Sequence, residues 1–307
     1  MKYFVYTVIA MMTACGQSKK NAGSPTSKTG PLEVVAVNYP LQFFTERIGG
    51  EHVKVILPVP ADEDPADWRP AGEQAREFIA KTQKADLILL NGAGYAKWIK
   101  YGIWSEAQLV YTSSAIKDSL LETDKEHQSV HKHGKDGNEH SHAAMAYTIW
   151  LDPILAIQQA DAIRKALERE KPNCKEEFTA SFEKLKTELE SMLEGVPKSD
   201  FPLLASHPVY QYLQKRFGLN LKSVHWEPED APPPEEWEAL KTKLKEHPAK
   251  WMICEGEPLP ETARKLRDLG VEPILFDPCG NVPEEGDYFT VMRANFANLK
   301  KALSGKK

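Results

Sequence analysis

Ala85-Asp86-Leu87-Ile88-Leu89-Leu90-Asn91-Gly92-Ala93-Gly94 is the stretch that decides the fold class of this 307-residue chain. Its first six residues form a nearly continuous apolar run, which is typical of a strand buried on both faces of a sheet. A helical pattern over 71–84 precedes the run, and a glycine-rich turn follows it. Helix, buried strand and turn in this order form the unit from which parallel α/β sheets are built.

The same alternation covers most of the chain. Strands are expected at 34–37, 52–59, 85–90, 109–112, 202–206, 221–226, 251–254 and 273–276, with helices between most of them. Two longer helical patterns, 153–169 and 174–194, separate the two groups of strands, and the second could form a stiff spine with Asn173 as its cap. We therefore predict an N-terminal α/β lobe (32–171), a linking helix (172–196) and a C-terminal α/β lobe (197–307).

The N-terminus predicts export. Lys2 precedes a short apolar run, Tyr3–Met12, which resembles a signal peptide and is too short to span a bilayer. The run ends in Met12-Thr13-Ala14-Cys15, similar to a bacterial lipobox, so residues 1–15 are expected to be a lipoprotein signal with Cys15 as the lipidated residue. The polar segment 16–31 then serves as a flexible tether, which places the protein outside the cytoplasm on a membrane.

Bulk composition excludes some classes of partner. The formal net charge is -5, and no basic stripe is evident, so a nucleic-acid partner is not expected. A hydrophobic content of 41% is that of an ordinary globular protein, so a chain of this length has enough apolar residues to form two well-packed lobes. We expect the protein to act as a monomer.

Polar side chains follow several strands of the C-terminal half. His207, His225, Glu255 and Asp277 each lie at or just past the end of a predicted strand. Ligands of open parallel sheets bind beyond the carboxyl ends of the strands, and zinc and manganese favour a mixture of imidazole and carboxylate donors. A metal site is one interpretation. The alternative is that these side chains cap the following helices.

Several motifs resemble one known family. They are Val35-Ala36-Val37-Asn38-Tyr39-Pro40-Leu41, Gly49-Gly50-Glu51-His52-Val53, Asn91-Gly92-Ala93-Gly94, Trp150-Leu151-Asp152-Pro153, Ser206-His207 and Phe276-Asp277-Pro278. Their order and spacing resemble those of the solute-binding proteins of zinc and manganese ABC importers, over about 34–303. The resemblance implies two Rossmann-like lobes joined by a long rigid helix, a divalent metal as cargo in the cleft, an ABC permease as partner and no enzymatic activity. Zinc is the expected metal, with manganese or iron as alternatives.

The ligands that the resemblance implies are only half present. Its third and fourth ligands fall on His207 and Asp277, both in the C-terminal lobe. Its first two, both imidazoles of the N-terminal lobe, fall on Ala66 and Thr148. Because two protein donors leave a zinc site weak and hydrated, other groups have to complete it.

Three alternatives for the missing donors remain open. Asp67 adjoins Ala66 and could supply a carboxylate. His140 and His142 precede Thr148 and could fold back over the cleft. The C-terminal lobe could also complete the site itself, using His225, Glu255 or Cys279.

A histidine-rich stretch, 122–142, interrupts the N-terminal lobe. It has no apolar periodicity, which predicts an irregular loop. Neutral imidazoles bind zinc, so the loop could collect metal for the cleft; a solvated spacer is the alternative. The imidazoles belong to His127, His131, His133, His140 and His142.

Two cysteines follow strands of the C-terminal half. If the strands that end near Cys254 and Cys279 are neighbours, the two residues are close enough for a disulfide. Two free thiols are the alternative, and only then could Cys279 act as a metal ligand.

Two other classes of function are alternatives to a metal carrier. An exported hydrolase lacks support, because the chain has no His-Glu-x-x-His helix and no Gly-x-Ser-x-Gly turn. A two-lobed binder of a metal chelate is the other alternative, with Trp68 and Trp226 as stacking surfaces for an organic ligand.

Overall fold

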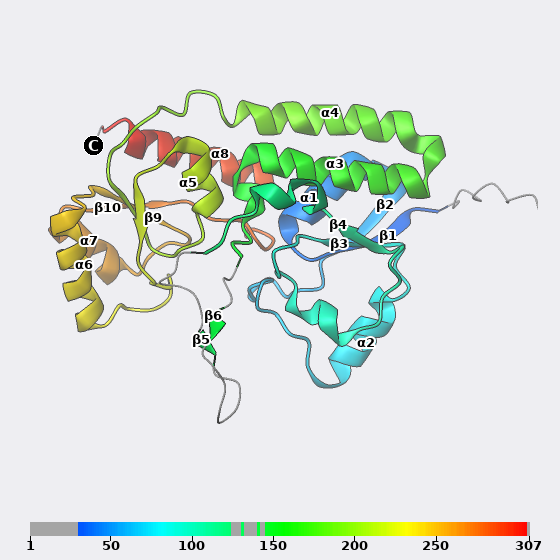
Figure 1. Ribbon diagram of the computed structural model, residues 1–307, viewed down its shortest axis with the longest axis horizontal. Coiled ribbons are helices and arrows are strands. Elements are labelled where there is room, and N and C mark those ends of the chain that lie inside the picture. The colour runs from blue at the N-terminus through cyan, green and yellow to red at the C-terminus, as the bar shows by residue number, and fades with distance from the viewer. Residues whose placement is uncertain (1–29, 124–129, 132–139, 142–144, 306–307) are drawn as a thin grey trace, which may run out of the picture.

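Two parallel sheets, one in each half of the chain, organise the fold (Figure 1). The computed structural model describes residues 30–123, 130–131, 140–141 and 145–305. The N-terminal sheet has the order β2-β1-β3-β4 and the C-terminal sheet the order β10-β9-β7-β8, and every pairing within them is parallel. The prediction of two α/β lobes is confirmed. The strands are β1 (Leu32–Ala36), β2 (Val53–Ile56), β3 (Leu87–Leu90), β4 (Leu109–Tyr111), β7 (Leu203–Ala205), β8 (Leu221–Ser223), β9 (Trp251–Cys254) and β10 (Glu272–Leu275).

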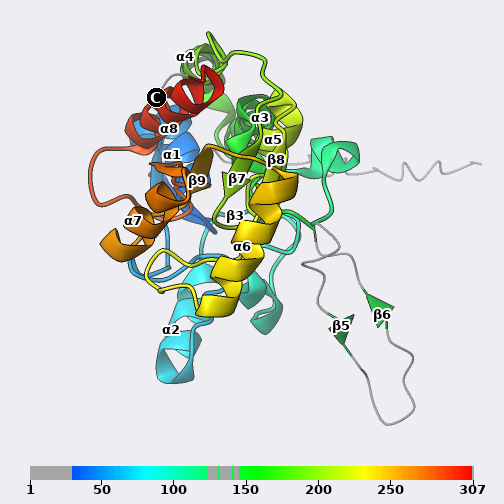
Figure 2. The same cartoon turned by 90° about the vertical axis from the view of Figure 1, so that its left-hand side faces the viewer.

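Helices cover both sheets. In the N-terminal lobe, α1 and α3 pack on one side of the sheet, and α2 lies at the opposite end of the lobe (Figure 1). In the C-terminal lobe, α6 and α7 lie on one face of the sheet (Figure 2). The helices are α1 (Tyr39–Gly49), α2 (Gly72–Thr82), α3 (Pro153–Glu170), α4 (Lys175–Ser191), α5 (Gln211–Phe217), α6 (Pro234–Glu246), α7 (Pro260–Asp268) and α8 (Tyr288–Leu303).

Polar side chains fix the starts of three of these helices. The Asn38 side chain accepts a hydrogen bond from the Leu41 N–H at the start of α1, and Asp152 and Asp287 cap α3 and α8 in the same way. For α4 the expected cap is wrong. Residue 173 lies in a short 3₁₀ turn, Pro172–Cys174, and Cys174 occupies the capping position without a side-chain bond.

The C-terminal strands alternate their side chains between two apolar layers. Leu203, Ala205 and Ile253 belong to the main core, which includes side chains of α5 and α8. Leu204, Met252 and Cys254 face the other way and pack with α6 and α7. A strand that is buried on both faces has a continuous apolar sequence, so the sequence pattern and the packing agree.

The main core runs through both lobes. Phe43 and Phe44 of α1 pack edge-on against Phe289 and Tyr288 of α8, with 5.2 Å between ring centroids in each pair. The Tyr288 hydroxyl also donates to the Trp150 carbonyl at 3.2 Å. The last helix of the chain therefore locks the C-terminal lobe onto the N-terminal one.

Helix α4 touches both lobes. It packs along α1 and α3, and its Glu188 forms ion pairs with Arg47 of α1 and Arg293 of α8. Figure 1 shows α4 lying along the outside of α3. These contacts fit a spine that limits movement between the lobes.

The histidine-rich stretch departs from the predicted irregular loop at two points. Its backbone forms a short antiparallel pair, β5 (Val130–His131) with β6 (His140–Ser141), and Glu122 pairs with Met145 at its base. His127, His133 and His142 lie outside the described residues, as do the signal segment and Cys15. Within the described part of the chain, no helix has the length and apolar character needed to cross a membrane.

Candidate metal site between the lobes

A cavity of about 290 Å³ opens between the lobes at the carboxyl ends of the C-terminal strands. The N-terminal lobe contributes Asp64, Tyr95 and Thr148 to its wall, and the C-terminal lobe contributes Glu255 and Asp277. This is the position at which open parallel sheets bind their ligands. Two of the predicted strand-end residues, Glu255 and Asp277, therefore line this cavity.

His207 and Glu255 come together because their strands are neighbours. His207 follows β7 by two residues, Glu255 directly follows β9, and β7 pairs with β9 in the sheet. The imidazole Nδ1 of His207 lies 3.5 Å from a carboxylate oxygen of Glu255. Both side chains are partly buried, so water only partly screens them.

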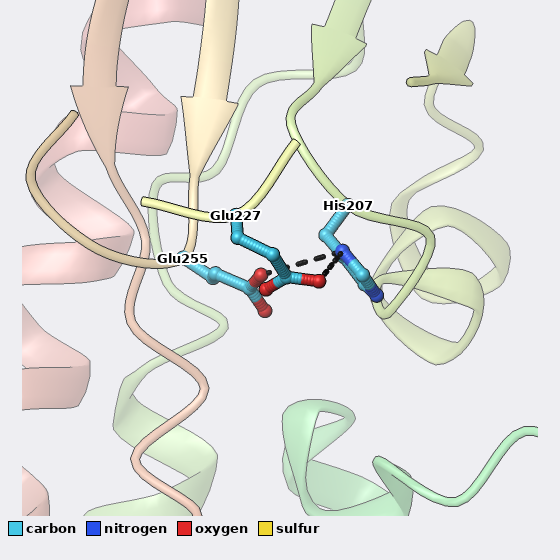
Figure 3. Close-up of side chains that lie close together, drawn as sticks. All are labelled: His207, Glu227 and Glu255. Carbon is cyan, nitrogen blue, oxygen red and sulfur yellow. Dashed lines mark ion pairs between the residues drawn. The ribbon is translucent and has the colours of Figure 1, made fainter. Parts of the chain in front are cut away.

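Glu227 completes the cluster, and the sequence analysis missed it. Its carboxylate lies 3.5 Å from Nδ1 of His207, and the three ligand atoms of His207, Glu227 and Glu255 lie within 4.8 Å of one another. Figure 3 shows both carboxylates directed at the imidazole. One imidazole and two carboxylates at this spacing form a donor set for a divalent metal ion.

The backbone beyond β8 explains how Glu227 reaches the cluster. The N–H of Trp226 still donates to the Ser206 carbonyl at 2.8 Å, so pairing continues past Ser223, where β8 ends. Trp226 is buried against α6, whereas His225 and Glu227 on either side of it are exposed. This period-two alternation was visible in the sequence and could have identified Glu227.

Acidic groups accumulate around the cluster. Burial, together with the negative charges of Glu227 and Asp64, raises the pKa of Glu255 to about 8. Burial also raises the pKa of Asp64, and the charges of Asp67 and Glu227 add to this. These carboxyls therefore disfavour further negative charge on one another. A divalent cation between them would relieve that repulsion.

Asp277 lies in the cavity wall but outside the three-residue cluster. Burial raises the pKa of its carboxyl, while a hydrogen bond from the Cys279 N–H to Oδ1, at 2.6 Å, acts in the opposite direction. Asn295 of α8 holds the Asp277 backbone through both its N–H and its carbonyl. Asp277 is thus rigidly placed at the edge of the site.

His225 and Asp67, two of the alternative donors, lie outside the three-residue cluster. The ring of His225 packs edge-on against that of His207, with centroids 5.0 Å apart. Asp67 forms an ion pair with Lys97 on the surface of the N-terminal lobe. The acidic residues that this loop brings to the cavity are Glu63 and Asp64, a few residues earlier.

The two N-terminal positions without imidazoles have structural roles. Ala66 is buried in the main core, and its N–H donates to Asp64 Oδ1 at 2.8 Å. Thr148 is also buried, and its hydroxyl donates to the Val209 carbonyl of the other lobe. Position 66 therefore helps to orient Asp64, and position 148 joins the lobes.

Of the two alternatives for Cys254 and Cys279, the structure has the free thiols and no disulfide between them. Strands β9 and β10 are neighbours, as the disulfide would need. However, the Cys254 side chain packs in the layer of α6 and α7, whereas Cys279 packs in the main core on the other side. Burial raises the pKa of both thiols, which keeps them protonated and disfavours Cys279 as a thiolate ligand.

Of the two expected stacking surfaces, Trp226 is buried and Trp68 is partly buried against the core. Trp226 packs on Trp237 with ring centroids 4.7 Å apart, and Trp68 packs on Phe78 at 5.1 Å. The rings that line the cavity belong instead to Tyr95, Tyr147 and Trp150. His140 is described only through its backbone in β6, so its side chain is not placed relative to the cavity.

Sequence comparisons agree on one family. A family model named ZnuA, described as "Zinc-uptake complex component A periplasmic", matches residues 34–302. The high-affinity zinc uptake system protein ZnuA of Bacillus subtilis (strain 168) is 28% identical over 317 residues, which cover 98% of this chain and 96% of that protein. The zinc-binding lipoprotein AdcA of Streptococcus pneumoniae is 26% identical over 94% of this chain, which spans 58% of that longer protein.

Solved structures share the fold. The metal-dependent lipoprotein YcdH from Bacillus subtilis has a TM-score of 0.73 at 23% identity, covering 89% of this chain and 99% of that one. Zn(II)-bound AdcA from Streptococcus pneumoniae has a TM-score of 0.72 at 21% identity, covering 90% of this chain and 59% of that one.

Proposed function

The chain belongs to the family of periplasmic components A of zinc-uptake complexes, and from this we propose that it captures a divalent metal ion, zinc, between its lobes and delivers it to an ABC importer. One observation carries the proposal: the side chains of His207, Glu227 and Glu255 converge beyond the carboxyl ends of the C-terminal strands, and the two glutamates line the cavity. Manganese and iron are the alternative cargoes, since carboxylates suit harder ions.

The site differs in composition from the one that the resemblance implied. His207 is kept, while two glutamates of the same lobe stand in for the imidazoles that positions 66 and 148 lack. We propose that His207, Glu227 and Glu255 bind the ion, and that Asp277 or water supplies the fourth donor of a tetrahedral site. Asp64 faces the cluster from the N-terminal lobe and adds negative potential.

The remaining proposals concern location and partners. Export and lipid anchoring through Cys15 would hold the two lobes at a membrane, next to an ABC permease. His127, His131, His133, His140 and His142 would collect zinc loosely and raise its concentration near the cleft. Relatives named as lipoproteins, such as AdcA and the manganese-transporter protein PsaA, support the anchoring.

Zinc titration by calorimetry tests the site. His207→Ala and Glu227→Gln should each weaken zinc binding by about tenfold or more, because each removes a direct donor. Glu257→Gln is the matched control, since Glu257 is an exposed carboxylate two residues beyond Glu255 and lies outside the cluster. Equal affinities for all three variants and the wild type would place the zinc site elsewhere.

A further inference from the structure

Two loops meet above the candidate metal site. The first, residues 57–71 between β2 and α2, carries Asp64 and is called the cleft loop below. The second, residues 276–286 between β10 and α8, carries Asp277 and is called the strap. One loop comes from each lobe, so their contact decides how the cavity is covered.

The strap is firmly attached to the N-terminal lobe. The Tyr39 N–H donates to the Gly280 carbonyl at 2.9 Å, and Trp150 Nε1 donates to the Pro278 carbonyl at 2.7 Å. Tyr39 begins α1, and Trp150 is buried in the core. The strap is therefore a fixed support.

The cleft loop has one anchored half and one exposed half. Ala66 is buried in the core and Trp68 packs on Phe78, so the second half is held by the N-terminal lobe. Residues 60–64 lie at the surface, although the Asp64 carboxyl is partly desolvated, and both Glu63 and Asp64 line the cavity.

Asn281 of the strap holds this exposed half at two points. Its Nδ2 donates to the Pro60 carbonyl at 2.6 Å and to the Glu63 carbonyl at 2.8 Å. Its own Oδ1 accepts from the Val282 N–H at 2.8 Å, which fixes the direction of the amide. Within the described part of the chain, the other hydrogen bonds of residues 60–64 lie inside the cleft loop itself.

Charge acts against this contact. Burial raises the pKa of Asp64, and the charge of Glu227 across the cavity adds to this increase. In protein without metal, repulsion between the two carboxylates would push the exposed half of the cleft loop outwards, and the bonds from Asn281 would oppose it.

We propose that Asn281 is a positioning residue that latches the cleft loop over the cavity and thereby sets the rate at which metal enters and leaves. This rests on the proposed function, because it assumes that the ion binds beneath the loop. Neither Asn281 nor the two carbonyls that it contacts belongs to the donor cluster, so the latch can hold the closed state with or without metal. Its loss should therefore change the rates far more than the equilibrium affinity.

Asn281→Asp and Asn281→Ala probe the latch. The aspartate keeps the shape and the bond from Val282, but replaces two donor hydrogens with a negative charge that faces two carbonyls. The alanine removes the donors without adding charge. Asn220→Asp is the matched control, because Asn220 also donates from Nδ2 to a carbonyl, that of Asp200 at 3.0 Å, and it is not among the residues that line the cavity.

The test is stopped-flow release of zinc into excess chromogenic chelator, combined with calorimetric affinities. Two neutral hydrogen bonds together correspond to about a tenfold effect, so release from Asn281→Ala should be roughly tenfold faster, and from Asn281→Asp faster still. Association should accelerate as well, so that the Kd changes much less than the release rate. Unchanged release in both variants, or a Kd that rises in full proportion to the release rate, would overturn the latch.

A second measurement needs no metal. A protease that cleaves after glutamate should cut the Glu63–Asp64 bond faster in metal-free Asn281→Ala than in the wild type or Asn220→Asp. Without the Asn281 bonds, the loop more often populates the open conformation that the protease can bind. Equal cleavage rates would also overturn the latch. If wild-type protein binds no zinc, the proposed function fails, and cleavage alone then decides whether Asn281 holds the loop.

Discussion

Glu255→Gln tests the electrostatics of the site most directly. The pKa of Glu255 is raised to about 8, so in the metal-free protein near pH 7 this carboxyl carries a proton. Metal binding requires the carboxylate, and the proton has to leave. For a pKa of 8, the ionised fraction grows roughly eightfold between pH 7 and pH 8.5, and the zinc affinity of the wild type should increase by the same factor.

Glutamine keeps the shape of Glu255 but has no proton to release. The zinc affinity of Glu255→Gln should be lower at every pH, because an amide oxygen is a weaker donor than a carboxylate. The roughly eightfold increase in affinity between pH 7 and pH 8.5 should disappear in this variant. Calorimetry at pH 7 in buffers of different ionisation enthalpy counts the protons released on binding. The variant should release about 0.9 proton fewer than the wild type, which is the protonated fraction expected for a pKa of 8.

Glu257→Gln is the control and should keep the wild-type slope and proton count. If Glu255→Gln releases as many protons as the wild type, Glu255 is not the group that ionises on zinc binding. A wild-type zinc affinity that does not change from pH 7 to pH 8.5 would lead to the same conclusion.

Three further outcomes are expected, each for protein without metal. Folding raises the pKa of Glu255, so between about pH 4.5 and pH 8 the folded state holds a proton that the unfolded chain has lost. Thermal stability should therefore fall as the pH rises through this window. Glu255→Gln should remove this fall, which is on the order of a few kcal/mol. Gly92→Ala should lower the free energy of unfolding in urea by about 1–3 kcal/mol, because Gly92 has φ +85 and an added Cβ would lie 1.9 Å from Ser113 Oγ. Thr148→Val should cost about 1 kcal/mol in the same assay by leaving the Val209 carbonyl without its donor, and Thr148→Ser should restore most of it.

The sequence by itself determined the frame of the molecule. The short apolar runs 85–90 and 251–254 predicted buried strands, and they contain β3 and β9. Side chains that directly follow such strands are bound to meet at one edge of the sheet, and His207 and Glu255 do so at 3.5 Å. Local periodicity suffices here, because a strand and its end are properties of a few consecutive residues.

The tertiary structure alone decided what happens in the irregular segments. Cys254 ends β9 and Cys279 lies beyond the adjacent strand β10, yet their side chains pack in opposite apolar layers. Asp64 rather than Asp67 faces the cavity. The Asn281 amide meets carbonyls more than 200 positions earlier in the chain. The direction of a loop side chain depends on contacts with distant segments, and no local pattern encodes those contacts.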